Sequence, residues 1–186
     1  MDGVLLVATQ ADMDADKVGE IQCQHRLTNE DGEAMTMVSH PPMVRDVNRT
    51  AGDIVAVVIA ETDSIAQDAM ELIDVRYYSM PAVTDVYAAV EDGAPQLYDE
   101  YPFNIAFNWV EGDHVSTNAA IAGAEAAGME LLDIDVVNNR VIINSMETRP
   151  MIAGPGEEEG SLDIWCGTQG PVGVAEQIAD ALGIAR

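Results

Sequence analysis

The stretch DIVAVVIAETDSIAQDAMELIDVRYY, residues 53–78, decides the fold of this 186-residue chain. Residues 53–60 form a continuous β-branched run, which is typical of a strand buried on both faces. Thr62 can cap the helix that follows, and residues 74–78 form the next predicted strand. The apolar face of the helix holds four residues at helical spacing: Ile65, Ala69, Leu72 and Ile73. This strand–helix–strand order predicts an α/β layer arrangement.

The segments on either side of this unit add one strand and one short helix. Residues 3–9 (GVLLVAT) form an apolar run that predicts a buried strand, whereas residues 17–41 are polar and irregular. Residues 85–92 predict a second short helix, which Gly93 ends. Residues 99–113 concentrate aromatic side chains and end in a charged glycine turn. We interpret them as the link to a second unit.

The second unit is predicted to be rich in strands. Three segments have the alternating or β-branched character of strands: 129–139, 140–146 and 161–167. The Asn pair at 138–139 suits a hairpin turn, because asparagine tolerates a positive φ. A final helix begins at Pro171 and ends at Gly183. Its apolar face comprises Ala175, Ile178, Ala179 and Leu182. The predicted fold class is α/β (α+β), with one domain at 1–112 and a second, strand-rich domain beginning at 113 and reaching 186.

Composition excludes several classes of function. The chain has 33 Asp and Glu against eight Lys and Arg, so its formal net charge is −25. A surface this negative repels nucleic-acid phosphates and anionic membranes. No apolar run reaches the length of about 18 residues that a membrane span needs. Cys23 and Cys166 build no disulfide framework, and Cys23 with His25 is too small a set for a metal site. We therefore expect a cytoplasmic globular protein with no metal held by its own side chains.

The acidity itself has two interpretations, which the sequence leaves open. A high-salt cytoplasm would screen the self-repulsion of a chain with 18 Asp, 15 Glu and a single lysine, Lys17. Alternatively, part of the acidic surface docks a more basic companion subunit.

One segment is a candidate binding site. WCGTQGPVG, residues 165–173, leads from a predicted strand through a tight glycine turn to the start of a helix, where free N–H groups suit an anionic ligand. The amide of Gln169 can both donate and accept hydrogen bonds there. The simpler alternative is that this turn only caps the helix. Glu147 and Arg149 form a structural ion pair or line a site, and the pair is the simpler interpretation.

Several motifs in order resemble the xanthine dehydrogenase and aldehyde oxidase family. Residues 41–95 are similar to its α/β hammerhead domain, through AGDIVAVVIAET followed by a helix and VRYYSMPAV. The second half continues in family style with NIAFNWVEGD, VVNNRVIINSMETRPMIA and LDIWCGTQGPVGV. The resemblance is greatest to molybdopterin-binding large subunits, including those of the carbon monoxide dehydrogenase type.

The resemblance implies a molybdenum–molybdopterin cofactor, of which the cytosine dinucleotide form is one option. Such enzymes oxidise a small substrate with oxygen from water and pass electrons to FAD and [2Fe–2S] clusters on companion subunits, in a hetero-oligomer. The family motif places Gln169 at the molybdenum centre and Gly170 beside the cofactor. The resemblance also implies that the chain is a fragment, inactive by itself. The alternative function is a stand-alone, non-catalytic α/β interaction or assembly module.

Overall fold

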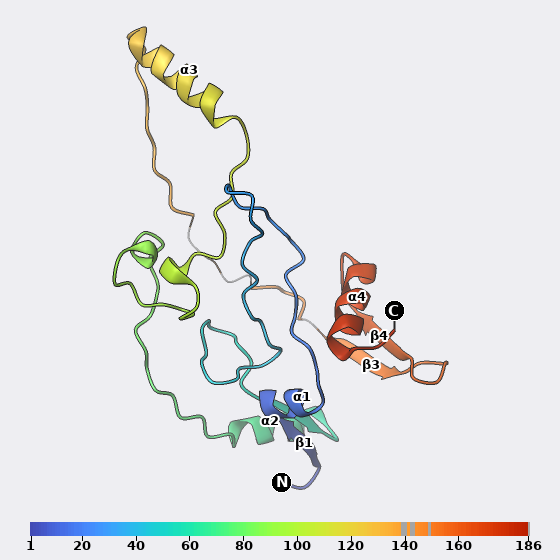
Figure 1. Ribbon diagram of the computed structural model, residues 1–186. Helices are drawn as coiled ribbons and strands as arrows, with labels where there is room; N and C mark the ends of the chain where they lie inside the picture. Colours follow the sequence, from blue (N-terminus) through green and yellow to red (C-terminus); the bar gives the residue numbers. More distant parts are fainter. Residues whose placement is uncertain (139–140, 142–143, 149, 186) are drawn as a thin grey trace. The chain divides into compact units, whose positions relative to one another are not determined.

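The computed structural model describes residues 1–138, 141, 144–148 and 150–185, and its contacts divide the chain into two units (Figure 1). The first unit comprises Met1–Trp109 together with Val172–Arg186. The second comprises Val110–Pro171. Helices and small antiparallel sheets alternate along the chain, which confirms the mixed α/β class.

The first unit is organised around a two-stranded antiparallel sheet. Strand β1 (Val4–Ala8) pairs with strand β2 (Val57–Ala60), and Ala8 lies opposite Val57. Both strands are predicted from the sequence, but β2 is shorter than residues 53–60. It is also half-exposed rather than buried on both faces. A two-stranded sheet covered on one side leaves the other face open, so the prediction of a doubly buried strand is wrong.

Strand β2 starts late because its partner ends: Ala8 pairs with Val57, and the chain enters a helix at Gln10. Asp53 holds the turn that precedes β2. Its carboxylate accepts hydrogen bonds from the Thr50 hydroxyl (2.6 Å) and from the backbone amides of Thr50 (2.9 Å) and Arg49 (2.8 Å). These bonds close a turn that an extended strand could not form. Burial raises the pKa of Asp53, but the bonds from Thr50 and Arg49 and the nearby charge of His40 outweigh it and lower the pKa below its ordinary value.

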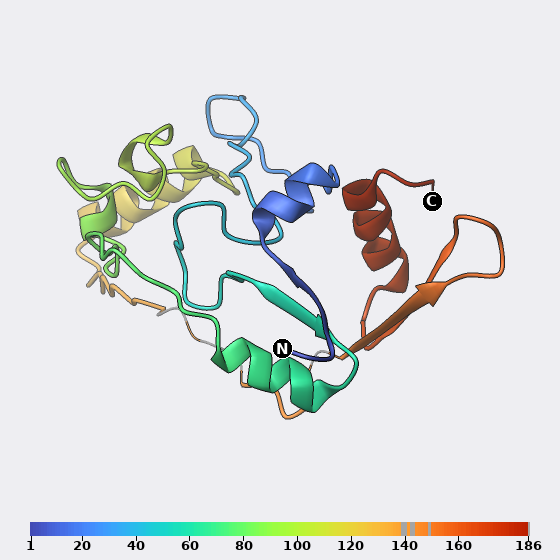
Figure 2. The same cartoon turned by 90° about the horizontal axis from the view of Figure 1, so that it is seen from below.

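Helix α2 (Asp63–Glu71) packs against β2 and β1 (Figure 2). The Thr62 hydroxyl accepts a hydrogen bond from the Ile65 amide at 3.3 Å, which confirms the predicted cap. Ala69 is buried, but Leu72 is 73% exposed, because the helix ends at Glu71 and Leu72 turns out of its apolar face. The predicted face is therefore right for Ala69 and wrong for Leu72.

Two predicted elements beyond α2 are absent from the structure. Residues 74–78 form no strand, and Tyr78 is 92% exposed. A strand needs a hydrogen-bonded neighbour, and the described residues provide none for this segment. The helix expected at 85–92 shrinks to a 3₁₀ turn, Ala88–Val90. The Asp85 carboxylate accepts hydrogen bonds from the Tyr87 and Ala88 amides at the start of this turn, as a cap does. A second 3₁₀ turn spans Pro102–Asn104.

Two helices are not predicted by the sequence pattern. Helix α1 (Gln10–Ala15) follows β1 directly and opens with a capping box. Helix α3 (His114–Ala126), in the second unit, begins where the Asp113 carboxylate accepts a hydrogen bond from the Ser116 amide at 2.8 Å. Alanine-rich α3 has high helix propensity but little apolar periodicity, and α1 is too short to show any.

A β-hairpin carries the regular structure of the second unit beyond α3. Strand β3 (Met151–Pro155) pairs antiparallel with β4 (Leu162–Cys166), and Ile152 lies opposite Trp165. Strand β4 confirms the prediction for 161–167. Residues 129–138 form no strand, since no neighbour pairs with them among the described residues. The strand expected at 140–146 and the Asn turn at 138–139 lie partly outside the described residues.

Helix α4 (Pro171–Leu182) follows β4 and matches its predicted bounds. Gly183 takes a left-handed φ of 66° just after its end, as the predicted C-cap requires. Ala179 is buried and Ile178 half-buried, whereas Ala175 and Leu182 are exposed, so only half of the predicted apolar face packs. The backbone of Ala181 accepts a hydrogen bond from Gly19 at 2.6 Å, which ties α4 to the first unit.

Few side chains form the core. The buried apolar residues of the described chain are Ala8, Met43, Ala69 and Ala179. Gln10 is buried beside them, with 2% of its surface exposed. Large apolar side chains are exposed in both units, among them Leu72, Tyr78 and Leu132.

The buried amide of Gln10 should be a main anchor of the first unit. Its Oε1 accepts the Met43 amide at 2.8 Å and its Nε2 donates to Asp14 at 2.9 Å. In Gln10→Leu the Met43 amide loses its acceptor, so we expect the free energy of unfolding of the complete protein to fall by about 1–3 kcal/mol in a denaturant titration. Gln67→Leu is the matched control, because Gln67 also donates to an aspartate four positions away but is exposed. Equal losses in the two variants would contradict the role of Gln10.

Gly3 should be essential for the packing of α2. Its φ is +82°, and a Cβ there would lie 2.7 Å from Ile65 Cδ1. Gly3→Ala should therefore carry the cost of a left-handed residue, about 1–2 kcal/mol, and displace Ile65 as well. Gly52→Ala separates the two effects, because Gly52 has a φ of +99° and a Cβ there would meet no atom within 4 Å. We expect the thermal midpoint to fall further for Gly3→Ala, and equal shifts would contradict a tight contact with α2.

Candidate functional site

The candidate segment lies between β4 and α4. Strand β4 ends at Cys166, which is held opposite Met151 of β3, and α4 begins at Pro171. Between them the Thr168 hydroxyl accepts a hydrogen bond from the Gly170 amide at 3.1 Å. This bond spans Gln169 and folds the turn locally. This bond lies before α4 and involves an amide outside that helix, so it does not test the capping interpretation.

Gln169 is exposed at this turn. Its amide offers two donor hydrogens and one acceptor oxygen, which suits a ligand with both oxo and hydroxyl groups. Gly170 is exposed as well, and a Cβ at that position would meet no atom within 4 Å. The backbone at Gly170 is thus open to a ligand that approaches closely. The exposed groups of Gln169 and Gly170 can bind a ligand through hydrogen bonds.

Glu147 lies near the same turn. A Cβ at Gly167 would stand 3.7 Å from Glu147 Oε1, which places this carboxylate beside the exit of β4. The expected structural ion pair with Arg149 lies outside the described residues. The proximity of Glu147 to Gly167 follows from the β3–β4 pairing and has no signal in the local sequence.

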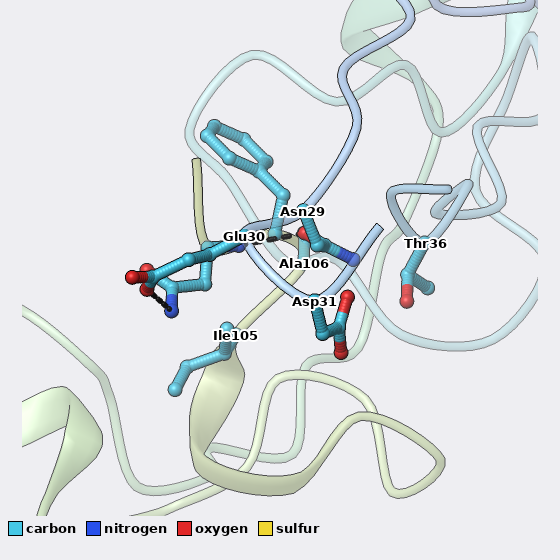
Figure 3. A pocket seen from close by; sticks show the side chains of 8 residues that line it. Asn29, Glu30, Asp31, Thr36, Ile105 and Ala106 are labelled. Atoms are coloured by element: carbon cyan, nitrogen blue, oxygen red, sulfur yellow. Dashed lines mark hydrogen bonds between the residues drawn. The ribbon is translucent and has the colours of Figure 1, made fainter. Parts of the chain in front are cut away.

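The first unit contains a hollow that the sequence does not predict (Figure 3). It measures about 400 Å³ and is lined by two distant segments, 29–36 and 105–108. The backbone of Thr36 donates to Ala106 at 2.8 Å, and the Asn108 amide donates to Asn29 Oδ1 at 2.8 Å. The side chains of Glu30 and Asp31 make the hollow acidic. No sequence signal points to it, because it arises from pairing between segments far apart in the chain.

The described residues hold no cluster of three or more His, Cys, Asp or Glu side chains that could bind a metal ion. Cys23 donates a hydrogen bond to the backbone oxygen of His25 at 3.2 Å and lies in an exposed loop, as predicted. Within the same described part, the helices are all too short or too polar to cross a membrane.

Comparison with known proteins identifies two adjoining domains. The family model for the aldehyde oxidase and xanthine dehydrogenase a/b hammerhead domain matches residues 1–81. The model for the molybdopterin cofactor-binding domain matches residues 97–186 and includes the Gln169 turn. Together the two matches cover most of the chain, in the order in which the sequence motifs occur.

Individual relatives agree with these matches. The nicotine 6-hydroxylase large subunit of Paenarthrobacter nicotinovorans is 32% identical over 92% of this chain and 20% of its own length. The carbon monoxide dehydrogenase large chain of Afipia carboxidovorans is 27% identical over 78% of this chain and 20% of its own. The chain thus spans about a fifth of the length of these curated relatives.

A solved structure extends the likeness to three dimensions. The quinoline 2-oxidoreductase of Pseudomonas putida 86 matches 99% of this chain and 22% of its own chain, with a TM-score of 0.65 and 28% identity. The family predicted from the sequence motifs is therefore confirmed. By its two domain matches, its relatives and its fold, the chain belongs to the aldehyde oxidase and xanthine dehydrogenase family.

Proposed function

We propose that this chain is part of the large subunit of a molybdenum-containing hydroxylase or dehydrogenase that oxidises a small substrate. The observation that carries the proposal is the ordered pair of domain matches, hammerhead and molybdopterin cofactor-binding, on one chain. Relatives named as a nicotine hydroxylase and a carbon monoxide dehydrogenase support the same class of chemistry.

The residues of the turn fit a molybdenum–molybdopterin cofactor in the hydrogen bonds they offer. Gln169 presents an exposed amide that can both donate and accept, and Gly170 leaves its backbone open to close approach. The described side chains provide no metal-ligand cluster of their own, so their part toward this cofactor is hydrogen bonding. When bound, the cofactor supplies oxidation of the substrate with oxygen derived from water.

The mechanism assigns each residue of the turn a different task. Gln169 would hold the cofactor through a hydrogen bond from its exposed amide. Gly170 would contact it through its open backbone. Thr168 holds the turn by accepting the Gly170 amide at 3.1 Å. The β3–β4 hairpin fixes the position of the turn through the pairing of Cys166 with Met151.

We assign residues 1–112 to the hammerhead domain and residues 113–186 to the first cofactor-binding domain. The division of contacts at Trp109 and Val110 supports this boundary, although Val172–Arg186 packs with the first unit. We further propose a cytoplasmic hetero-oligomer in which companion subunits carry FAD and [2Fe–2S] clusters. The cytosine dinucleotide form of the pterin belongs to the same proposal.

The exposed apolar surface favours this function over a stand-alone interaction or assembly module. Leu72, Tyr78 and Leu132 are 73%, 92% and 83% exposed, on separate segments of the chain. Isolated soluble proteins rarely expose apolar side chains on this scale. The remainder of a large subunit, about four times the length of this chain in the curated relatives, would provide the covering surface.

Gln169→Ala in the complete enzyme tests the proposed role. We expect kcat to fall about tenfold to a hundredfold, because one charge-assisted hydrogen bond at the reacting centre is lost. The thermal midpoint should stay nearly unchanged, since Gln169 is exposed. Gln24→Ala is the matched control, as it removes an exposed loop glutamine in the first unit and should leave kcat at the wild-type value. A wild-type kcat for Gln169→Ala, with molybdenum content equal to wild type, would rule the role out.

A further inference from the structure

The acidic residues have the same density in the two units. The first unit has 22 Asp and Glu among 124 residues, and the second has 11 among 62. All but Glu20 and Asp53 of the 33 are exposed. A docking face for a basic partner would place more of the acids on one unit. The equal density in the two units instead favours adaptation of the exposed surface to its solvent.

Eight cationic side chains cannot neutralise this surface. Arg45 pairs with Asp14 and lies 3.8 Å from Glu20, and Arg76 pairs with Asp74 at 3.4 Å. Even complete pairing of all Lys and Arg would leave 25 carboxylates without a partner of opposite charge. At low ionic strength such a net charge destabilises a folded state through self-repulsion.

Acidic residues also outnumber basic residues in the last turns of the helices. In each α-helix of the described residues the last turn contains an acidic residue and no basic one. These residues are Glu71 in α2, Glu125 in α3, Asp180 in α4 and, in α1, Asp14, whose charge Arg45 offsets. A carboxylate at the negative end of the helix dipole destabilises the helix, and the effect weakens as salt screens it. The arrangement is unfavourable in dilute buffer and nearly neutral in concentrated salt.

We propose that this protein folds and works in molar salt, and that ionic screening is a condition of its stability. The Debye length is about 10 Å at 0.1 M salt, which exceeds the length of a helical turn, and about 3 Å at 1 M. Molar salt therefore removes most of the repulsion among the surface carboxylates and at the helix ends. The acidic side chains then keep the protein hydrated without destabilising it.

Thermal unfolding of the complete protein across a KCl series tests this inference. We expect the midpoint to rise by about 10 °C between about 0.1 M and 2 M KCl. Glu71→Gln and Glu125→Gln, at the ends of α2 and α3, should raise the midpoint at low salt and have no effect at high salt. Asp63→Asn, in the first turn of α2, is the control of opposite sign and should lower the midpoint at low salt.

Three results would overturn the inference. One is a midpoint that does not change with KCl. Another is a midpoint that is flat in KCl but rises when a basic companion subunit is added, which would establish the docking interpretation of the acidic surface. The third is a midpoint that rises with KCl equally in wild type and in three variants: Glu71→Gln, Glu125→Gln and Asp63→Asn. A general effect of salt on apolar burial would then explain the rise.

Discussion

The pairing of β1 with β2 is the interaction on which the first unit depends. It brings residues from the two ends of a long, irregular segment together and creates the surface on which α2 packs. Ala8 and Ala69 are buried there, and Gly3 lets Ile65 approach the backbone closely. Gln10 then ties the loop at Met43 to the same centre through a buried hydrogen bond. Loss of this small core would leave the irregular segments of the unit without support.

The candidate site depends on a different and weaker support. Gln169 is held by the β3–β4 hairpin on one side, by the Thr168 hydrogen bond across it, and by the fixed φ of Pro171 on the other. A two-stranded hairpin is marginally stable by itself, so the geometry of the turn relies on additional packing. The apolar side chains exposed on the hairpin, such as Ile152 and Trp165, are available for that packing. The proposed role of Gln169 therefore depends on packing that the rest of the proposed large subunit would provide.

The sequence predicts those parts of the structure that local signals determine. The Thr62 cap, strand β4, and helix α4 with Gly183 at its end follow from residue chemistry within a few positions. Partners elsewhere in the chain decide the rest. Residues 74–78 have strand composition but no neighbouring strand among the described residues. The β-branched run at 53–60 forms a strand only from Val57, because its partner β1 ends at Ala8.

At the candidate site too, the sequence predicts what local signals determine and does not predict contacts between distant segments. The glycine turn with Gln169 is readable from the order of strand, turn and helix, and the family motif adds its proposed chemistry. The proximity of Glu147 to Gly167 and the hollow between 29–36 and 105–108 arise from contacts between distant segments. The sequence does not predict helices α1 and α3 for another reason. Helix α1 is too short to show an apolar stripe, and the side chains of α3 are too uniformly small to show one.

We propose that this chain forms part of a molybdopterin-binding enzyme. The molybdenum and pterin content of the complete protein, purified from a host that makes the cofactor, tests this proposal. We expect both in amounts equal to the polypeptide, measured by elemental analysis and by fluorescence of the oxidised pterin. A folded protein without either, from a host in which a known family member is loaded, would contradict it.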